Sequence, residues 1–411
     1  MAPPQLGSRA SLPPGRGRCH CGRVMLLAAL VLASCSERAT STTSSSTGPS
    51  SSTSTTTSTV SVPTTTLGGA ILQQFVPSSA TTWWAVVEAN ATGLSYVVRT
   101  ADSGLRWQEV RPIAQGGTYY FLSSEVAWAE PGPGDTLWRT LDGGSSWRGL
   151  GTVPSACSQL QFVDDVHGWC SAIGAAAGST WVTLSRTTAG GATWALVSRT
   201  GAPSGGRSTP GSLPSSCDKT ITFTSPSGGW ASSWCNGGSA VLYTTKDGGS
   251  RWYALSTVPL PPGRSTPGGE GLGVPAVAGH DLASALSIGG LRGTITGIAT
   301  SQDGGVTWHA QLVPGPRRYW NVDLIDPTHW RLTDGSVVMV TDDAGRHWST
   351  WKPAIAMKDS LGTPLTLEFL SPTLGWAVPG PNGGPFWWTE DGGLTWKPLE
   401  VVAGPFILPA R

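Results

Sequence analysis

Acidic side chains recur at one fixed place in an eight-residue pattern, T/S-x-D-x-G-x-x-W. Carboxylates could act there as acids, bases or metal ligands. Six copies of the pattern keep the carboxylate, and its residues are Asp102, Asp142, Asp247, Asp303, Asp343 and Asp391. A seventh copy, at residues 187–194, has Ala189 in that place. Asp, Gly and Ser are turn residues, and an Asp carboxylate can accept N–H bonds within its own turn. We therefore interpret these aspartates as structural.

The pattern predicts a tight turn between two β-strands. Gly at its fifth position permits a positive φ, and the first hydroxyl can hold the turn from the other side. The Trp at its end opens the next strand and places its ring in the packing layer. A second pattern, Gly-Trp or Trp-Ala, precedes each turn and is clearest at Trp169, Trp230 and Trp376. Weaker copies lie at Trp84, Trp128 and Trp330, whereas residues 282–284 (Leu-Ala-Ser) lack the Trp.

Together the two patterns define a repeat of four strands, A to D, with the Gly-Trp segment in strand B and the repeat turn between C and D. In the sixth repeat we expect strands at 319–324, 329–333, 337–341 and 347–351. Repeats of 40–58 residues fit propeller blades. The sequence therefore predicts an all-β protein, with a seven-bladed β-propeller of four-stranded antiparallel blades over residues 67–411. The first and last blades would close by contact, with 406–408 adding to a sheet.

These residues and their spacing resemble the Asp-box, or bacterial neuraminidase repeat, propellers. A single seven-bladed ring with a box in nearly every blade is most similar to the propellers of photosystem II assembly and stability factors. The resemblance covers about residues 67–411 and implies the fold. It does not imply one function, since relatives include sialidases, xyloglucan-cleaving glucanases, sortilin-type receptors and assembly factors.

Enzymatic relatives would need residues that are hard to find in this chain. The sialidase arginine motif has only Arg111-Pro112-Ile113 as a match, in the wrong order. A glycosidase needs two carboxylates facing a cleft. On the face opposite the repeat turns the expected carboxylates are sparse, and they are Glu130, Asp135, Asp218, Glu270 and Asp334. G-x-S-x-G, Walker and H-E-x-x-H motifs are missing from the sequence, so we assign no catalytic residue, metal or cofactor.

The same opposite face carries arginines in the loops that join strand D to the next strand A. The segment GRSTPG occurs at 206–211 and again at 263–268, and a third loop holds two arginines. We expect Arg207, Arg264, Arg317 and Arg318 to form a surface for an anionic group on a protein, glycan or envelope polymer. The alternative is a pair of duplicated, solvated loops.

The function predicted from these features is a non-catalytic binding or scaffold module for a protein or an envelope polymer. The alternative is an exo-acting glycoside hydrolase, sialidase-like or glucanase-like, that uses the loop face. The formal net charge of +1 gives no argument for nucleic acid. We expect a monomer.

The N-terminus has the layout of a bacterial export signal. Four arginines precede a ten-residue apolar run at 24–33, which is followed by Ser34 and Cys35. We expect residues 1–34 to be a lipoprotein signal peptide and Cys35 to be lipidated; the alternative is an ordinary cleaved signal. We expect residues 35–66 to be the lipidated Cys followed by a Ser/Thr-rich flexible linker. The protein would thus lie on the extracellular side of the cytoplasmic membrane, attached only by its lipid.

Four cysteines remain in the folded part, and an oxidising compartment favours disulfides between them. Because pairs close in sequence would each close a short loop, we expect Cys157–Cys170 and Cys217–Cys235. The alternative is a zinc site, for which the ligand spacing is wrong.

Overall fold

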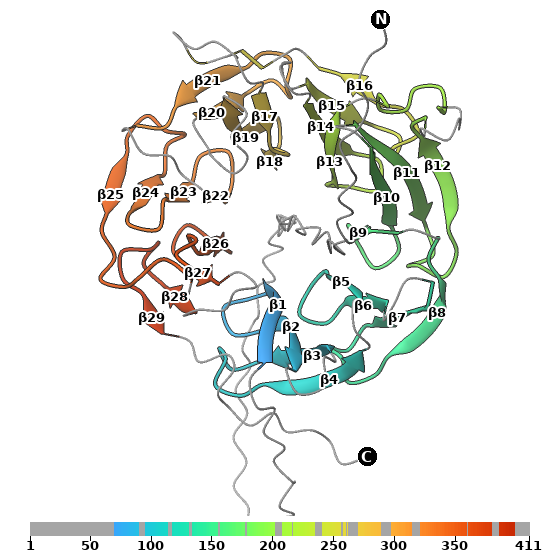
Figure 1. The fold of residues 1–411 in the computed structure, drawn as a ribbon, viewed down its shortest axis with the longest axis horizontal. Helices are drawn as coiled ribbons and strands as arrows, with labels where there is room; N and C mark the ends of the chain where they lie inside the picture. The colour runs from blue at the N-terminus through green and yellow to red at the C-terminus, as the bar shows by residue number, and fades with distance from the viewer. Residues whose placement is uncertain are drawn as a thin grey trace, which may run out of the picture. The chain divides into compact units, whose positions relative to one another are not determined.

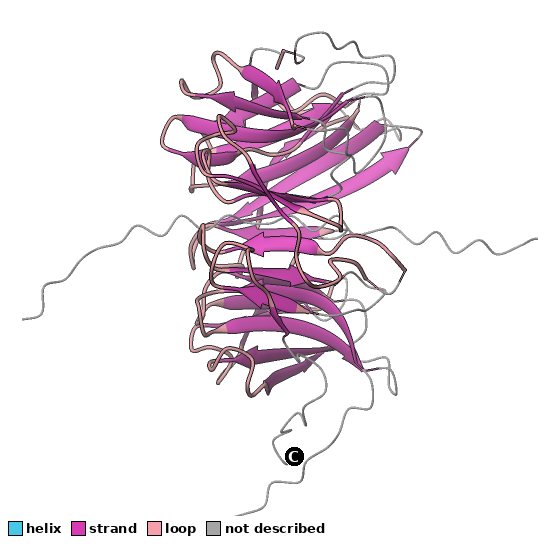
Figure 2. Cartoon of the chain, turned by 90° about the vertical axis from the view of Figure 1, so that its left-hand side faces the viewer, coloured by secondary structure: helices cyan, strands magenta, loops and turns pink. Residues whose placement is uncertain are grey.

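The described part of the chain forms seven separate antiparallel sheets arranged as the blades of a propeller (Figure 1); each has the four strands of a blade, and one has a fifth short strand paired to it. The computed structural model describes residues 70–398, apart from 90–94, 114–116, 131–133, 155–156, 177–178, 202–207, 216, 235–240, 256–257, 260, 262–269, 289–296, 315–320, 360 and 380–385. The all-β, seven-bladed propeller predicted from the sequence is confirmed. Viewed edge-on (Figure 2), the described residues form strands and loops and no helix, so no helix among them could cross a membrane.

Each blade is a meander of consecutive strands, A to D. Blades 1 to 3 consist of β1 (Ala70–Pro77), β2 (Trp83–Ala89), β3 (Ser95–Thr100) and β4 (Gln108–Ile113); β5 (Thr118–Phe121), β6 (Ala127–Glu130), β7 (Thr136–Thr140) and β8 (Arg148–Thr152); and β9 (Gln159–Phe162), β10 (Gly168–Ala176), β11 (Ser179–Thr187) and β12 (Ala195–Arg199). Blade 4 consists of β13 (Asp218–Phe223), β14 (Gly229–Trp234), β15 (Val241–Thr245) and β16 (Tyr253–Ala254).

Blade 5 consists of β17 (Glu270–Leu272), β19 (Asp281–Ile288), β20 (Gly297–Ser301) and β21 (His309–Leu312), with β18 (Ala276–Ala278) also paired to β19. Blades 6 and 7 consist of β22 (Asn321–Leu324), β23 (Trp330–Thr333), β24 (Val338–Thr341) and β25 (Ser349–Trp351), and of β26 (Thr366–Phe369), β27 (Gly375–Val378), β28 (Trp387–Thr389) and β29 (Lys397–Pro398). Because strands in a meander alternate in direction, the A–B turns and the C–D turns lie at the same end of every blade. We call that end the repeat-turn face.

Among the C–D turns, the repeat turns, the six that keep the aspartate share one hydrogen-bond pattern, and the seventh, in blade 3, keeps the bonds of its first hydroxyl. In the turn at 301–308, the Ser301 hydroxyl donates to Asp303 Oδ1 (2.8 Å) and accepts from the Gly305 N–H (2.9 Å). Asp303 Oδ1 also accepts from the Thr307 N–H (2.8 Å), and the Thr307 hydroxyl donates to Oδ2 (2.6 Å). These bonds lower the pKa of Asp303 to about 2, the largest effect being the Thr307 hydroxyl.

The fifth-position glycine has a positive φ in all seven repeat turns, for example +87° at Gly305. The fourth position is also left-handed, which the pattern did not predict. It is Gly in five turns, but Ser103 (+58°) and Ala344 (+60°) occupy it in blades 1 and 6. Both residues carry a Cβ in a conformation that L-residues seldom adopt.

Contacts between blades depend on the indole of strand B. Trp128 stacks on Phe162 of blade 3 with ring centroids 3.6 Å apart, and its Nε1–H donates to the carbonyl oxygen of Gly190 (2.8 Å). Trp169 repeats both contacts with blade 4, stacking on Phe223 at 3.8 Å and donating to the carbonyl of Gly248 (2.9 Å). Such aromatic pairs contribute about 0.5–1.5 kcal/mol each beyond the area that they bury.

The ring closes where blade 7 lies beside blade 1 (Figure 1), through an aromatic cluster. Trp83 and Trp376, both fully buried, meet with centroids 5.4 Å apart. Phe75 of strand A contacts both of them and lies 4.7 Å from Phe386 of blade 7. Closure by contact is therefore confirmed, whereas the expected strand at 406–408 lies outside the described residues.

Side chains on the innermost strands bond the edge backbone of the next blade. The Tyr120 hydroxyl donates to the carbonyl of Phe162 (2.7 Å), and burial raises the pKa of this phenol to about 12. The Gln161 amide bonds both the N–H (2.9 Å) and the carbonyl (2.8 Å) of Phe223. These bonds satisfy strand-edge groups that would otherwise be unpaired.

In blades 6 and 7 the same inner position holds carboxylates. Asp323 accepts a hydrogen bond from the Phe369 N–H, and Glu368 is the matching residue of blade 7. Burial raises the pKa of Asp323 to about 7, although the Phe369 N–H and Arg331 oppose the shift. Burial and the neighbouring Asp323 raise the pKa of Glu368 to about 8. Glu368 therefore holds its proton to a higher pH in the folded chain than in the unfolded chain.

One disulfide is complete within the described residues, between Cys157 and Cys170, whose Cα atoms lie 5.6 Å apart. It joins strand B of blade 3 to the segment that precedes its strand A. Cys217 is also disulfide-bonded, while Cys235 lies outside the described residues.

Restoring the missing carboxylate in blade 3 should stabilise the protein. The Thr187 hydroxyl already accepts from the Ala189 and Gly191 N–H groups but has no carboxylate to bond. We expect Ala189→Asp to raise the unfolding free energy by roughly 0.5–1 kcal/mol and Tm by about 1–2 °C, measured by calorimetry. Thr188→Asp puts the same charge one residue earlier and should not raise Tm. An equal rise in both variants would contradict the role given to the carboxylate.

The inner carboxylate pair should make stability fall with rising pH. The folded state holds a proton that an unfolded Glu368 has released, so stability is full below about pH 4.5 and is lost as pH rises through about 8. We expect Glu368→Gln to leave Tm nearly unchanged near pH 5 and to raise it by several degrees near pH 9, measured by thermal melts across pH. Glu390→Gln, which alters an exposed carboxylate of the same blade, is the control and should show no such gain.

Candidate functional site

Two residues that face each other across strands B and C pack against the next blade and fill the space between the two blades. In blades 1 to 3 this pair is a Trp on strand B and an Arg on strand C. The pairs are Trp84 with Arg99, Trp128 with Arg139, and Trp169 with Arg186. All three indoles are fully buried, so the repeat favours a large flat side chain at this position.

The arginine of the pair bonds the A–B turn of the next blade. Arg99 Nε donates to the carbonyl of Ser124 (3.1 Å), and Arg139 Nη1 donates to the carbonyl of Asp165 (2.8 Å). In blade 6 the Trp position itself holds an arginine, Arg331, whose Nη2 donates to the carbonyl of Pro372 (2.7 Å). A guanidinium on a turn carbonyl is thus a recurrent contact between blades.

The strand register of blade 6 explains why Arg331, and not Trp330, covers the next blade. Trp330 pairs with Thr341, the first residue of the repeat turn, so it stands where blade 3 has Gly168. Arg331 therefore takes the place of the indole and lies over the ring of Phe369, 5.6 Å from its centroid. The sequence pattern alone had placed Trp330 with the other strand B indoles.

Blade 5 is the exception among the seven pairs. Its pair is Ala283 with Thr300, so both large side chains are missing. Trp330 of blade 6 is in the same buried cluster as Ala283 and fills the inner part of the space that they leave. The outer part remains open as a cleft of about 520 Å³.

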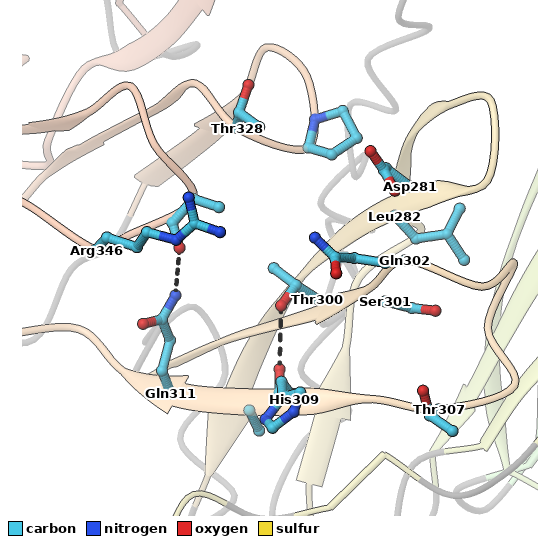
Figure 3. A pocket seen from close by; sticks show the side chains of 13 residues that line it. Asp281, Leu282, Thr300, Ser301, Gln302, Thr307, His309, Gln311, Thr328 and Arg346 are labelled. Carbon is cyan, nitrogen blue, oxygen red and sulfur yellow. Dashed lines mark hydrogen bonds between the residues drawn. The ribbon is translucent and has the colours of Figure 1, made fainter.

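The cleft lies on the repeat-turn face, between the sheet of blade 5 and the turns of blade 6 (Figure 3). From blade 5 its polar lining includes Asp281, Thr300, Gln302, His309 and Gln311. Blade 6 contributes Pro327, Thr328, Ala344 and Arg346.

The charges of the cleft are separated. Figure 3 shows Asp281 and Gln302 towards one end, and Arg346 beside Gln311 towards the other. Gln311 Nε2 is held by the carbonyl of Ala344 (2.7 Å), which fixes that wall. The side chain of Asp281 is exposed, and its carboxylate accepts no hydrogen bond from the described residues. The lining can therefore bind a donor at one end and an acceptor at the other.

Asp281 is the only carboxylate among the described residues that line the cleft. Of the acidic residues expected on the opposite face, Glu130 is buried, and its carboxylate accepts from the Gly134 N–H (3.1 Å). Burial, opposed by that bond and aided by Asp135, raises the pKa of Glu130. Asp334 accepts bonds from Ser336 and Val337 within its own turn. The side chains of Asp218 and Glu270 lie outside the described residues.

The other site residues predicted from the sequence fall into two groups. Arg207, Arg264, Arg317, Arg318 and Cys35 all lie outside the described residues. The six aspartates of the repeat turns each accept the hydrogen bond of the first Ser or Thr hydroxyl, and their residues are Asp102, Asp142, Asp247, Asp303, Asp343 and Asp391.

Sequence reasoning missed the cleft, although its signal was present. The segment 282–284 lacks the strand B indole, and the residue before the repeat turn is Thr300 rather than the arginine of blades 1 to 3. Only the observed register shows that these two substitutions face each other and leave one interface open.

Comparisons with known proteins support the fold. No protein-family model and no curated protein sequence matches the chain. Among solved structures, YCF48 from Cyanidioschyzon merolae is similar, with 16% identity over 80% of this chain and 95% of that chain and a TM-score of 0.44. A GH74 xyloglucanase from Xanthomonas campestris has 15% identity over 79% of this chain and 60% of its own, with a TM-score of 0.43. A prolyl endopeptidase has 9% identity over 81% of this chain and 50% of its own, with a TM-score of 0.53. Likeness at such identities concerns the fold alone and shows no particular activity.

Proposed function

We propose that the protein is a non-catalytic binding module that holds a segment of a protein partner in the cleft between blades 5 and 6. The observation that carries this proposal is the open interface at Ala283 and Thr300, in a ring whose other six pairs each contain a Trp or an Arg. A gap kept at one blade, with donors and acceptors on both walls, is a feature expected of a binding site.

The chemistry of the cleft supports binding rather than hydrolysis. A glycosidase of the usual kind needs two carboxylates across its cleft, and the described lining contains Asp281 alone. The aspartates nearby on the same face are engaged in their own turns, as Asp303 and Asp343 show. We infer that the cleft recognises its ligand and leaves it unchanged.

We also propose that the ring belongs to the Asp-box propellers and is exported and attached to the outer side of the membrane through a lipid on Cys35. The shared bonds of the repeat turns support the first part. The disulfide between Cys157 and Cys170 supports an oxidising compartment. We propose the arginine-bearing loops at 206–211 and 263–268 as a second contact surface.

Site-specific photo-crosslinking in cells would test the cleft as the binding site. Gln302 and Thr188 occupy the same exposed place in the repeat turns of blades 5 and 3, but the interface beside Thr188 is filled by Trp169 and Arg186. We expect a photo-reactive residue at 302 to give one discrete protein adduct, and one at 188 to give none. The readout is an immunoblot, followed by mass spectrometry of the adduct.

Two outcomes would contradict this proposal. The first is the same adducts from both positions, or none from position 302. The second is turnover: cleavage of an oligosaccharide by the full chain that is abolished in Asp281→Asn would make the cleft catalytic.

Loss of the lipid site should release the protein. We expect Cys35→Ser to move most of the protein from the membrane fraction to the medium and to abolish labelling by a fatty-acid probe, because one thioether lipid supplies the attachment. Fractionation with immunoblotting measures both effects, and Cys157→Ser, which affects only a disulfide of the ring, is the control for labelling. Unchanged labelling of Cys35→Ser would refute the anchor.

A further inference from the structure

We propose that the cleft between blades 5 and 6 binds an arginine side chain of the partner polypeptide, which supplies from outside the guanidinium that other blades supply from their own strands. This inference rests on the proposed function, because it names the group that the cleft would recognise. It follows from comparing the same interface around the ring.

The first step is the position of the acceptor. The A–B turns of blades 2, 3 and 7 each begin with a Ser or Asp whose side chain accepts a backbone N–H three residues later. The next residue in each turn offers its carbonyl to an arginine of the preceding blade, and these carbonyls belong to Ser124, Asp165 and Pro372. In blade 6 the turn begins in the same way, with Asp326 accepting from the His329 N–H (2.9 Å). The equivalent carbonyl is therefore that of Pro327.

The second step is that the carbonyl of Pro327 has no hydrogen-bond donor among the described residues. Pro327 lines the cleft and is itself buried, yet its carbonyl accepts no hydrogen bond from the part of the chain that the structure describes. Thr300, at the arginine position of blade 5, is too short to reach across, and its hydroxyl is directed to the carbonyl of His309 (3.5 Å). A carbonyl of a buried residue that has no partner among the described residues favours a ligand that brings a donor.

The third step concerns the negative charge at the cleft. Asp281 lies at the same cleft and its carboxylate has no hydrogen-bond partner among the described residues, so a cation there would gain a charge-assisted bond. Gln302, beside Asp281 in Figure 3, adds an amide oxygen. Acceptors on both walls suit the planar, five-donor guanidinium better than the point charge of a lysine.

The far end of the cleft limits what surrounds that arginine. Arg346 is exposed there, close to Gln311, and it disfavours a second cation. An acidic side chain or a backbone carbonyl of the partner would fit at this end. The preferred segment is thus one arginine flanked by neutral or acidic residues, rather than a run of basic residues.

The test uses the full chain and blocked tripeptides Gly-Arg-Gly, Gly-Lys-Gly and Gly-Glu-Gly, with binding followed by protein-observed NMR. We expect the arginine peptide to shift the side-chain amide signal of Gln302 and to bind at least about fivefold more tightly than the lysine peptide. Asp281→Asn should weaken binding of the arginine peptide about fivefold or more and leave Tm within about a degree, because this carboxylate is exposed and bonds none of the described residues.

A second variant, at position 300, supplies the guanidinium from the chain itself. Thr300→Arg restores the side chain that Arg99, Arg139 and Arg186 provide in blades 1 to 3. We expect it to raise Tm by a few degrees and to abolish binding of the arginine peptide. Thr300→Val, which keeps the size of the side chain, should leave the binding in place. Equal binding of the three peptides, or an arginine peptide that still binds Thr300→Arg, would overturn the proposal.

The outcomes separate this inference from the proposed function. A discrete adduct from position 302 with no preference for the arginine peptide keeps a binding module and removes the arginine. Selective arginine binding that Thr300→Arg abolishes, with no adduct in cells, keeps the subsite and removes the protein partner.

Discussion

Each blade of this ring is a narrow twisted sheet, and it is stable only because its neighbour covers one face of it. The contact that provides the cover is a flat side chain from one blade placed on the next. Trp128 on Phe162 and Trp169 on Phe223 are nearly parallel stacks, at interplanar angles of 4° and 2°. Each indole also donates to a turn carbonyl of the blade it covers. Packing and hydrogen bonding thus fix the same neighbour at the same place.

This arrangement makes the repeat turn part of the interface as well as a corner of the chain. The carbonyls that accept the indoles of Trp128 and Trp169 belong to Gly190 and Gly248, both at the fourth, left-handed position of a repeat turn. The carboxylate and hydroxyl bonds hold that turn in shape, and the turn then presents its carbonyl to the preceding blade. The repeated aspartates therefore serve the ring and are not available for chemistry on a ligand.

The sequence alone was sufficient for the blade count, the strand order and the turn bonds, because those features are local. A hydroxyl, a carboxylate and a glycine within five residues determine a turn whatever surrounds them. The contacts between blades were less accessible, because they depend on register. In the sequence, Trp330 resembles the strand B indoles of the other blades. In the structure it lies one position earlier in strand B than they do, and Arg331 occupies the position that covers the next blade. The buried pair of Asp323 and Glu368 was missed for the same reason, since its members come from different blades.

At the cleft, blade 5 lacks the flat side chain with which the other blades cover their neighbours, and only part of that contact is replaced. With Ala283 and Thr300 at the pair, blade 5 offers blade 6 no flat side chain. The displaced register of blade 6 brings Trp330 against Ala283, and this restores the apolar core near the inner strands. Among the described residues nothing equivalent restores the polar contact farther out, where the carbonyl of Pro327 has no guanidinium like the one that Pro372 receives from Arg331. An arginine at position 300 would supply this contact from within the ring, as Arg331 does for Pro372, and in its place the proposed ligand supplies it from outside.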